Sequence, residues 1–140
     1  SFQHYLHGMI HAFLTCFVYL YTASKRNTMN AVQNKVIQAC NACVQACYYC
    51  ATSCLREADV SQLANCIQID LECAEICEKT ATFTIRDSDF TFSLAELCAA
   101  ACEKCAEICA RYEHNHCQVC AAACRDCAYT CRQLVAMSSL

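Results

Sequence analysis

Seventeen of the eighteen cysteines recur at helical intervals, and this repeat constrains the fold more than any other feature of the chain. The seventeen fall into four groups, and every interval within a group is 3, 4 or 7 residues. Side chains at such intervals share one face of a helix, like the a and d positions of a helical bundle. The repeat therefore predicts four helices that turn cysteine-lined faces toward a shared interior.

We refer to these seventeen residues as the stripe cysteines and treat each as a candidate metal ligand. Grouped by segment, they are Cys40, Cys43, Cys47, Cys50 and Cys54; Cys66, Cys73 and Cys77; Cys98, Cys102, Cys105 and Cys109; and Cys117, Cys120, Cys124, Cys127 and Cys131. Cys16 stands apart from all four groups, and we exclude it from the candidate site.

Polar breaks between the groups divide the chain into four helical segments, expected at about 30–57, 60–82, 90–112 and 116–137. One glycine and no proline leave the chain without the residues that β-sandwiches and barrels use for their turns. Short connections make consecutive helices antiparallel neighbours. The predicted fold is all-α: an antiparallel up-down-up-down four-helix bundle with a cysteine-lined core, preceded by an N-terminal extension.

Three of the expected helix starts carry patterns typical of N-caps. Asp59 with Gln62, and Ser93 with Glu96, match the capping box, in which the two side chains bind free N–H groups reciprocally. Asn115 is the candidate N-cap of the last helix. We expect these side chains to satisfy the first N–H groups of their helices.

The chain is expected to divide into an N-terminal apolar extension at 1–29 and a metal-binding bundle at 30–140. The extension is interpreted as an extra helix packed on the bundle, or as a segment not needed for function with Met29 as an alternative start. Either interpretation leaves the metal site in the second part.

An apolar run of 15 residues, Met9–Ala23, dominates the extension. It is too short for a comfortable membrane span. Lys25 and Arg26 follow the run, whereas a secretory signal carries its positive charges before the apolar run. We therefore expect a cytoplasmic protein without a membrane partner, and export only if the run acts as a signal.

The charge pattern excludes one class of partner. The net charge is −3, and acidic and basic residues are interspersed. Such a chain presents no basic patch to the phosphates of nucleic acid. We expect no nucleic-acid partner.

Cysteine used only as a small apolar residue would leave the core poorly filled. If each of the seventeen positions gives up about one methylene relative to leucine, the loss is on the order of 14 kcal/mol, at about 0.8 kcal/mol each. A domain is stabilised by only about 5–15 kcal/mol in total. The stripes therefore indicate that something other than side-chain packing fills the interior.

Disulfides, zinc and iron–sulfur clusters fit the stripes less well. Cysteines three or four residues apart on one helix are poorly placed for bridging, although cross-helix bridges stay open. Structural zinc sites close a tetrahedron of four ligands, and cluster sites use four cysteines at irregular spacings. Here the pairs follow one another along straight helices.

Multiple Cu(I) ions fit the pattern best. Cu(I) is a soft ion that prefers thiolates. If two sulfurs hold each ion and each sulfur bridges two ions, the stoichiometry approaches one ion per thiolate. Each monovalent ion then offsets one thiolate, so that no large net charge is buried. Binding is expected to release about one proton per cysteine, because the thiolate is the ligand.

Three segments also resemble a known family. NHCQVCAAACRDCAYTC at 115–131, NCIQIDLECAEIC at 65–77 and ACNACVQACYYCATSC at 39–54 closely resemble the cysteine-rich four-helix-bundle copper storage proteins. The resemblance covers about Asn30 to Met137. It implies storage of Cu(I) inside the bundle, frequently in a homotetramer, and forms without a secretion signal are cytosolic. A copper donor or acceptor protein is a further expected partner.

Histidines mark one end of the predicted bundle. His114 and His116 lie between the third and fourth segments, at the same end as the connection between the first and second. We interpret them as a metal entry, because imidazole binds Cu(I) less tightly than thiolate does. The alternative is that both are solvated loop residues. The resemblance favours entry, since members of the family carry histidine at this turn.

Three further residues lie near the stripes. Asp70 occupies a stripe position in the second segment, and we expect it to hydrogen-bond to a neighbouring helix. Met29 and Met137 are interpreted as apolar plugs at the end opposite the histidines, with weak thioether ligation as the alternative.

The function predicted from these features is storage and buffering of many Cu(I) ions, about one per stripe cysteine. The alternatives are a zinc store and a thiol redox buffer or sensor, although a sensor needs exposed thiols of low pKa. No cysteine is paired with a base and an orienting acid in the manner of an enzyme. We therefore expect no catalysis.

Overall fold

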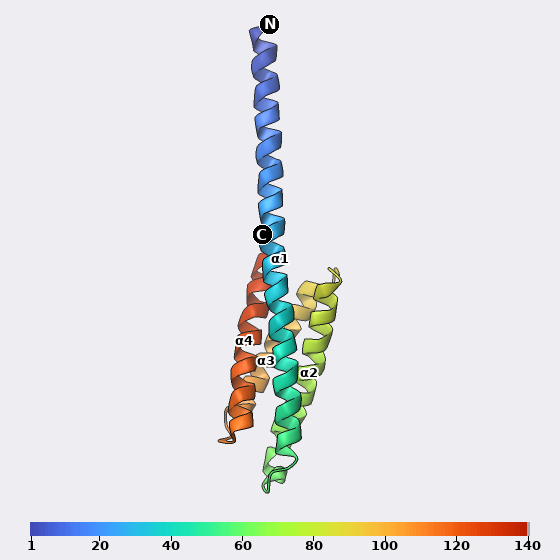
Figure 1. The fold of residues 1–140 in the computed structure, drawn as a ribbon, viewed down its shortest axis with the longest axis vertical. Coiled ribbons are helices and arrows are strands. Elements are labelled where there is room, and N and C mark those ends of the chain that lie inside the picture. Colours follow the sequence, from blue (N-terminus) through green and yellow to red (C-terminus); the bar gives the residue numbers. More distant parts are fainter. Residues whose placement is uncertain (140) are drawn as a thin grey trace. The chain divides into compact units, whose positions relative to one another are not determined.

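The computed structural model describes residues 1–139 and consists of helices joined by short turns. It contains α1 (Phe2–Cys54), a 3₁₀ turn η1 (Val60–Leu63), α2 (Ala64–Ile85), α3 (Thr91–Cys109) and α4 (Asn115–Met137) (Figure 1). The chain divides into two compact units, which we call the N-terminal unit (Ser1–Ala31) and the bundle unit (Val32–Leu140).

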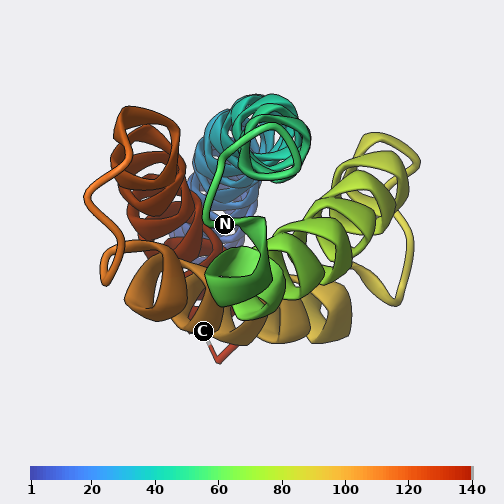
Figure 2. The ribbon, with the colours of Figure 1, turned by 90° about the horizontal axis from the view of Figure 1, so that it is seen from below.

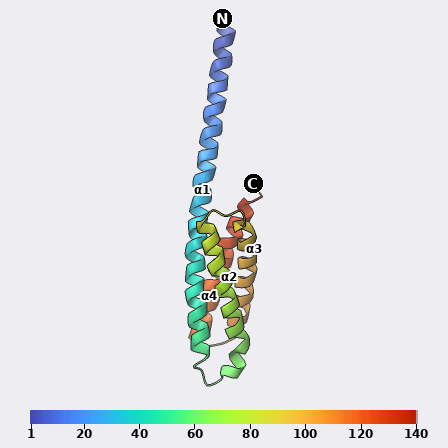
Figure 3. The same cartoon turned by 90° about the vertical axis from the view of Figure 1, so that its right-hand side faces the viewer.

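The bundle unit is the predicted antiparallel four-helix bundle. Seen end-on, the four helices surround one interior, with α1 beside α2 and α4, and α3 closing the opposite side (Figure 2). The α1–α2 and α3–α4 connections lie at one end and the α2–α3 connection lies at the other (Figure 3). The fold class predicted from the cysteine repeat is confirmed.

The first helix begins much earlier than predicted. The sequence placed its start at about residue 30, whereas α1 is helical from Phe2 onward. The extension is therefore helical, but it is part of α1 and not an additional element. The segment from Lys25 to Asn30 contains no proline or glycine, so nothing in it interrupts the helix.

None of the three predicted caps forms. The N-cap positions are Leu63 for α2, Phe90 for α3 and His114 for α4, and none of these has a side-chain cap hydrogen bond. The predictions failed because α2 begins only after the 3₁₀ turn that follows Asp59, and Asn115 lies one residue inside α4. Ser93 likewise falls within the first turn of α3.

A tight turn ends α2 without glycine. Asp87 adopts a left-handed conformation, φ 50°, which an Asp side chain tolerates better than most. The N–H of Ser88 donates to the carbonyl of Phe83, and the N–H of Asp87 donates to the carbonyl of Thr84. This pair of bonds is a Schellman motif, which satisfies the last carbonyls of the helix. The chain can then reverse into α3 within five residues.

The interior of the bundle unit is lined by sulfur. All seventeen stripe cysteines are fully buried. Alanines fill adjacent positions, and they allow the helix backbones to approach the column of thiols; the buried alanines are Ala39, Ala51, Ala74, Ala81, Ala95, Ala99, Ala106, Ala121 and Ala128. Larger apolar side chains close the ends, and Val36, Leu63 and Leu134 have no exposed surface.

Candidate metal centre

Sulfurs from all four helices meet in the middle of the bundle. The Sγ atom of Cys43 lies 3.5 Å from that of Cys124, 3.8 Å from that of Cys102 and 4.0 Å from that of Cys73. These four residues come from α1, α4, α3 and α2. The eighteen cysteines all lie within the described residues, and all are free thiols.

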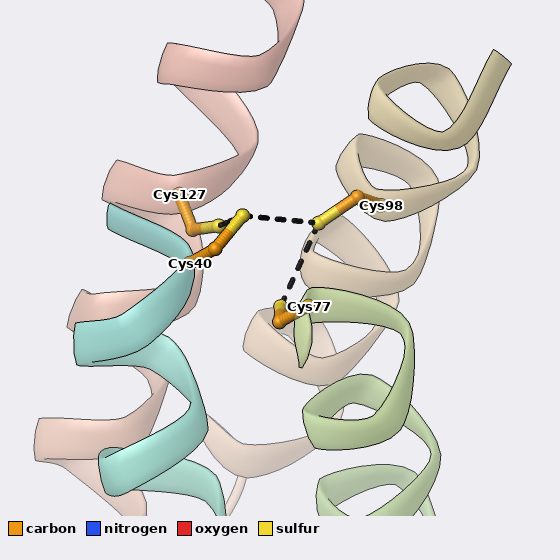
Figure 4. A group of neighbouring side chains, drawn as sticks. All are labelled: Cys40, Cys77, Cys98 and Cys127. Carbon is orange, nitrogen blue, oxygen red and sulfur yellow. Dashed lines mark hydrogen bonds between the residues drawn. The ribbon is translucent and has the colours of Figure 1, made fainter. Parts of the chain in front are cut away.

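One such level is drawn in Figure 4. Cys98 of α3 points at Cys40 of α1 and Cys77 of α2, with Sγ–Sγ distances of 3.9 and 3.6 Å. Cys127 of α4 lies 3.8 Å from Cys40. The four ligand atoms all lie within 4.8 Å of one another. Such a spacing suits metal–thiolate bonds, which are about 2.3 Å long for zinc, because two bonds in line would span about 4.6 Å.

Neighbouring levels share sulfurs, so that the sites form one column. Cys77 belongs to the level of Cys40 and also to the next one, which contains Cys43. Cys43 and Cys73 belong to that level and to the one that contains Cys47 and Cys124. A shared sulfur can bridge two ions. The geometry therefore permits a continuous chain of metal ions.

His116 closes the column at the end where α3 joins α4. Its Nδ1 lies 3.4 Å from Sγ of Cys117, 3.6 Å from Cys50 and 3.8 Å from Cys54. Its Nε2 lies 2.9 Å from a carboxylate oxygen of Glu57. A carboxylate only accepts hydrogen bonds, so the proton of the neutral imidazole is on Nε2. The nitrogen that faces the sulfurs, Nδ1, is therefore unprotonated. We call this cluster of His116, Cys50, Cys54 and Cys117 the mouth.

His114 is placed differently from His116, although the sequence grouped the two. Its ring stacks on that of His116, with centroids 5.2 Å apart. Its Nε2 lies 3.2 Å from both carboxylate oxygens of Asp59. The hydrogen bond to Asp59 raises the pKa of His114. His114 therefore lies on the outer side of the mouth, among carboxylates, and His116 contacts the sulfurs.

Glu57 and Asp59 are site residues that sequence analysis missed. Asp59 was assigned to a helix cap, and its side chain instead binds His114. Glu57 holds His116 in the orientation that faces the thiols. Both follow α1 in the connection to α2, and no spacing in the sequence links them to histidines more than fifty residues later. Only the folded connection brings them together.

Asp70 lies inside the column, fully buried. Its Oδ1 accepts hydrogen bonds from the thiols of Cys105, Cys109 and Cys120, at 3.2 to 3.3 Å. Burial raises the pKa of Asp70 to about 8, because a carboxylate is poorly solvated there. The predicted hydrogen bond to a neighbouring helix is confirmed, with partners on both α3 and α4.

The thiols of the mouth and the adjacent Cys66 differ in their pKa values. Burial raises the pKa of Cys54 to about 11, and it also raises the pKa of Cys117. Cys66 lies 3.3 Å from Cys109, and this hydrogen bond lowers the pKa of Cys66 to about 3. Soft metal ions bind the thiolate form, so metal binding at Cys54 and Cys117 must release protons.

The other end of the column is closed by apolar and internally bonded side chains. Val36, which precedes the first stripe cysteine of α1, and Leu134, which follows the last cysteine of α4, are fully buried. Thr80 and Thr84 donate to helix carbonyls four residues earlier, at 2.8 and 2.7 Å. Met137 is half-buried. The sulfur column is thus capped by groups that carry no charge.

Comparison with known proteins points to one family. Residues 29–136 match the sequence model of a family described as copper storage protein. An uncharacterised cysteine-rich protein of Bacillus subtilis (strain 168), YhjQ, is 41% identical over 90 residues, which are 64% of this chain and 83% of that protein.

Two solved structures show the same fold. The Cu(I)-bound copper storage protein BsCsp3 superposes with a TM-score of 0.72 at 40% identity, over 74% of this chain and 98% of that one. A cytosolic copper storage protein from Streptomyces lividans, in a structure of copper loading with five coppers, gives a TM-score of 0.77 at 37% identity. That match covers 79% of this chain and 97% of the Streptomyces chain.

Proposed function

Since this chain belongs to the copper storage protein family and stores Cu(I) on the thiolates that line its bundle, we propose that the seventeen stripe cysteines are its ligands. The single observation that carries the proposal is their burial in one column, with sulfurs of different helices 3.3 to 4.0 Å apart. Cys16 is exposed and lies outside the column. The proposed store occupies residues 30–140.

Loading exchanges protons for copper. Each entering ion displaces the protons of the thiols that bind it, and each thiolate then offsets one positive charge. Sulfurs shared between neighbouring levels bridge successive ions, so that the column fills at about one ion per cysteine. Asp70 accepts hydrogen bonds from thiols in the copper-free protein, and burial raises its pKa, which disfavours the carboxylate form that a ligand would need.

Copper enters at the mouth. His116 offers Nδ1 beside the three mouth cysteines, and Glu57 fixes the ring in that orientation. His114 and Asp59 lie outside it and guide the ion inward. Because imidazole holds Cu(I) less tightly than thiolate, an ion that meets His116 first passes on to the sulfurs.

The wider role follows from storage. We infer that the bundle stores copper in the cytoplasm, forms a homotetramer, exchanges copper with a donor or acceptor protein, and catalyses no reaction. These inferences are supported by the resemblance to the family. Cys50, Cys54 and Cys117 lie beside His116, which Glu57 orients, but all three thiols are fully buried, so that a substrate larger than a metal ion cannot reach them.

The ligand assignment is tested by removing one stripe. Replacing Cys66, Cys73 and Cys77 with serine removes every thiolate that α2 contributes, while the hydroxyls keep a similar size. The tightly bound copper count should fall by at least three relative to the native chain, measured under anaerobic conditions against a Cu(I) chelator. Cys16→Ser is the matched control and should leave the count unchanged. An unchanged count in the triple variant would contradict the assignment.

A further inference from the structure

The N-terminal unit is a helix of exposed, uncharged residues. The first 24 residues contain no aspartate, glutamate, lysine or arginine. Every described residue from Ser1 to Thr28 is exposed. Its large apolar side chains are Phe2, Tyr5, Leu6, Met9, Ile10, Phe13, Leu14, Phe17, Val18, Tyr19, Leu20 and Tyr21. A helix that exposes so much apolar surface is destabilised in water.

The helix is long enough to cross a lipid bilayer. A helix of the 15 residues in the apolar run is only about 22 Å long, at about 1.5 Å per residue. The hydrocarbon core of a bilayer is about 30 Å thick, so this run alone is too short to cross it. Because the helix starts at Phe2, its uncharged part extends from Phe2 to Ala23 and spans about 33 Å. By length and composition, α1 contains a segment capable of spanning a membrane.

Three polar side chains of this segment, those of His11, Thr15 and Thr22, find partners within the helix. Thr15 donates to the carbonyl of His11 at 2.7 Å, and Thr22 donates to that of Tyr19 at 2.9 Å. The Nδ1 of His11 lies 3.5 Å from the hydroxyl of Thr15. Internal partners of this kind are what polar groups need where no water is present.

The C-terminal end of the segment carries the residue types expected at a membrane surface. Tyr19 and Tyr21 precede Lys25 and Arg26, so that aromatic and basic residues occupy the level of the head groups. The first acidic residue of the chain is Glu57. By the positive-inside rule, the chain from Lys25 onward then lies on the cytoplasmic side. An amphipathic helix that lies along the surface would instead carry a charged face.

We propose that residues 2–23 span a lipid bilayer and tether the copper store to the cytoplasmic face of the membrane. The proposal corrects the expectation drawn from the 15-residue run, because the structure adds residues 2–8 to the helix. It does not depend on which residues bind copper. A failure of this proposal would leave the ligand assignment intact.

The test places the Cu(I)-loaded full chain in vesicles of phosphatidylethanolamine and phosphatidylglycerol. After an alkaline carbonate wash, the protein should float with the vesicles in a density gradient. Leu14→Lys puts a charge at mid-span and should lower the ratio of bound to free protein by about 100-fold. Thr28→Lys adds the same charge outside the span, and it should float like the native chain. A native chain that stays in the wash would overturn the proposal.

Cysteine labelling gives an independent result on the same vesicles. Copper occupies the core thiols, so Cys16 is the thiol that remains free to react. Cys16 lies near mid-span, and the bilayer should protect it from a membrane-impermeant maleimide. In a Cys16→Ser background, Thr28→Cys should be labelled. Equal labelling of the two positions would mean that the helix lies in water, and protection of both would mean that protein covers it. Either outcome would overturn the proposal.

The orientation is tested in cells. The thiol of Thr28→Cys should react with the same reagent in inside-out membrane vesicles and not in right-side-out ones. The reverse pattern would overturn the cytoplasmic placement of the store.

Discussion

The two ends of the sulfur column differ in the side chains that close them. At the mouth, His116 contacts three cysteines, and carboxylates of Glu57 and Asp59 hold the two stacked histidines. At the opposite end, Val36 and Leu134 are fully buried, and threonine hydroxyls are bonded to their own helices. One end presents groups that can bind or pass a cation, whereas the other offers only apolar packing.

The two ends of the bundle therefore contribute different properties to the protein. The closed end contributes stability, because large apolar side chains are packed there among smaller cysteines and alanines. The mouth contributes access, because its polar groups are partly exposed and can move without emptying the core. Asp70, the one buried carboxylate of the described residues, contacts Cys105, Cys109 and Cys120 and lies toward the mouth half. Substitutions at the two ends should therefore affect different measurements.

The largest effect is expected from Leu134→Ala at the closed end. Truncation of a fully buried leucine loses its burial and leaves a cavity, which should lower the free energy of unfolding of the copper-free protein by about 2–5 kcal/mol. Denaturant unfolding of the reduced protein under anaerobic conditions measures the change. The copper count should remain that of the native chain.

Val119→Ala is the matched control on the same helix. Val119 is 52% exposed, so its truncation should change the free energy of unfolding by less than about 0.5 kcal/mol. Equal costs at the two positions would show that the closed end is not a packed core.

The next effect concerns Asp70 and pH. Its pKa is raised from 3.8 to about 8, so between these values the folded protein holds a proton that the unfolded chain has lost. The stabilisation from this group is fully present below about pH 4 and is lost as the pH rises toward 8. Asp70→Asn removes this dependence.

This prediction is checked by measuring the free energy of unfolding in denaturant for two copper-free proteins, the native chain and Asp70→Asn, between pH 4 and 8. The cysteines that do not contact Asp70 contribute equally to both proteins, so the difference in unfolding free energy reports on Asp70 and the thiols bonded to it. The variant should gain stability relative to the native protein as the pH rises. A constant difference across the range would rule out a raised pKa.

A smaller effect is expected from His116→Ala at the mouth. Loss of the imidazole that faces the mouth cysteines should slow Cu(I) uptake about tenfold, equivalent to about 1.4 kcal/mol in the barrier. The final count should stay near that of the native chain. Stopped-flow transfer of Cu(I) from a coloured chelator complex measures the rate.

Two variants sharpen this comparison of the ends. Met137→Ala, near the closed end, should leave the rate of uptake unchanged. His114→Ala should slow uptake less than His116→Ala does, because His114 binds Asp59 and does not hold the inner position. If Met137→Ala slowed uptake as much as His116→Ala, copper would be entering at both ends.

The sequence predicted those features that depend on periodicity. Cysteine intervals of 3, 4 and 7 identified the four helices, their inward faces and the full set of buried thiols, because helical geometry alone relates spacing to position. Asp70 was placed correctly for the same reason, since it falls on the α2 stripe. The preference of Cu(I) for thiolates indicated the metal, and the family resemblance then supported its storage.

Features that depend on the path of the connections could not be predicted. The capping box at Asp59 failed because its side chain binds His114 after folding, and the one at Ser93 failed because α3 begins two residues earlier, at Thr91. His114 and His116 were grouped because they are two residues apart, but the turn directs one ring to carboxylates and the other to sulfurs. The start of α1 at Phe2 was missed because an apolar run does not reveal where its helix begins.

The central claim is that the whole column of buried thiols stores copper, and a count of bound ions tests it most directly. The reduced protein is titrated with Cu(I) under anaerobic conditions against a competing chelator, and tightly bound ions per chain are counted. The account predicts a count that approaches the seventeen buried cysteines, and the same count for Cys16→Ser. Saturation at only a few ions, or displacement of copper by zinc, would contradict it.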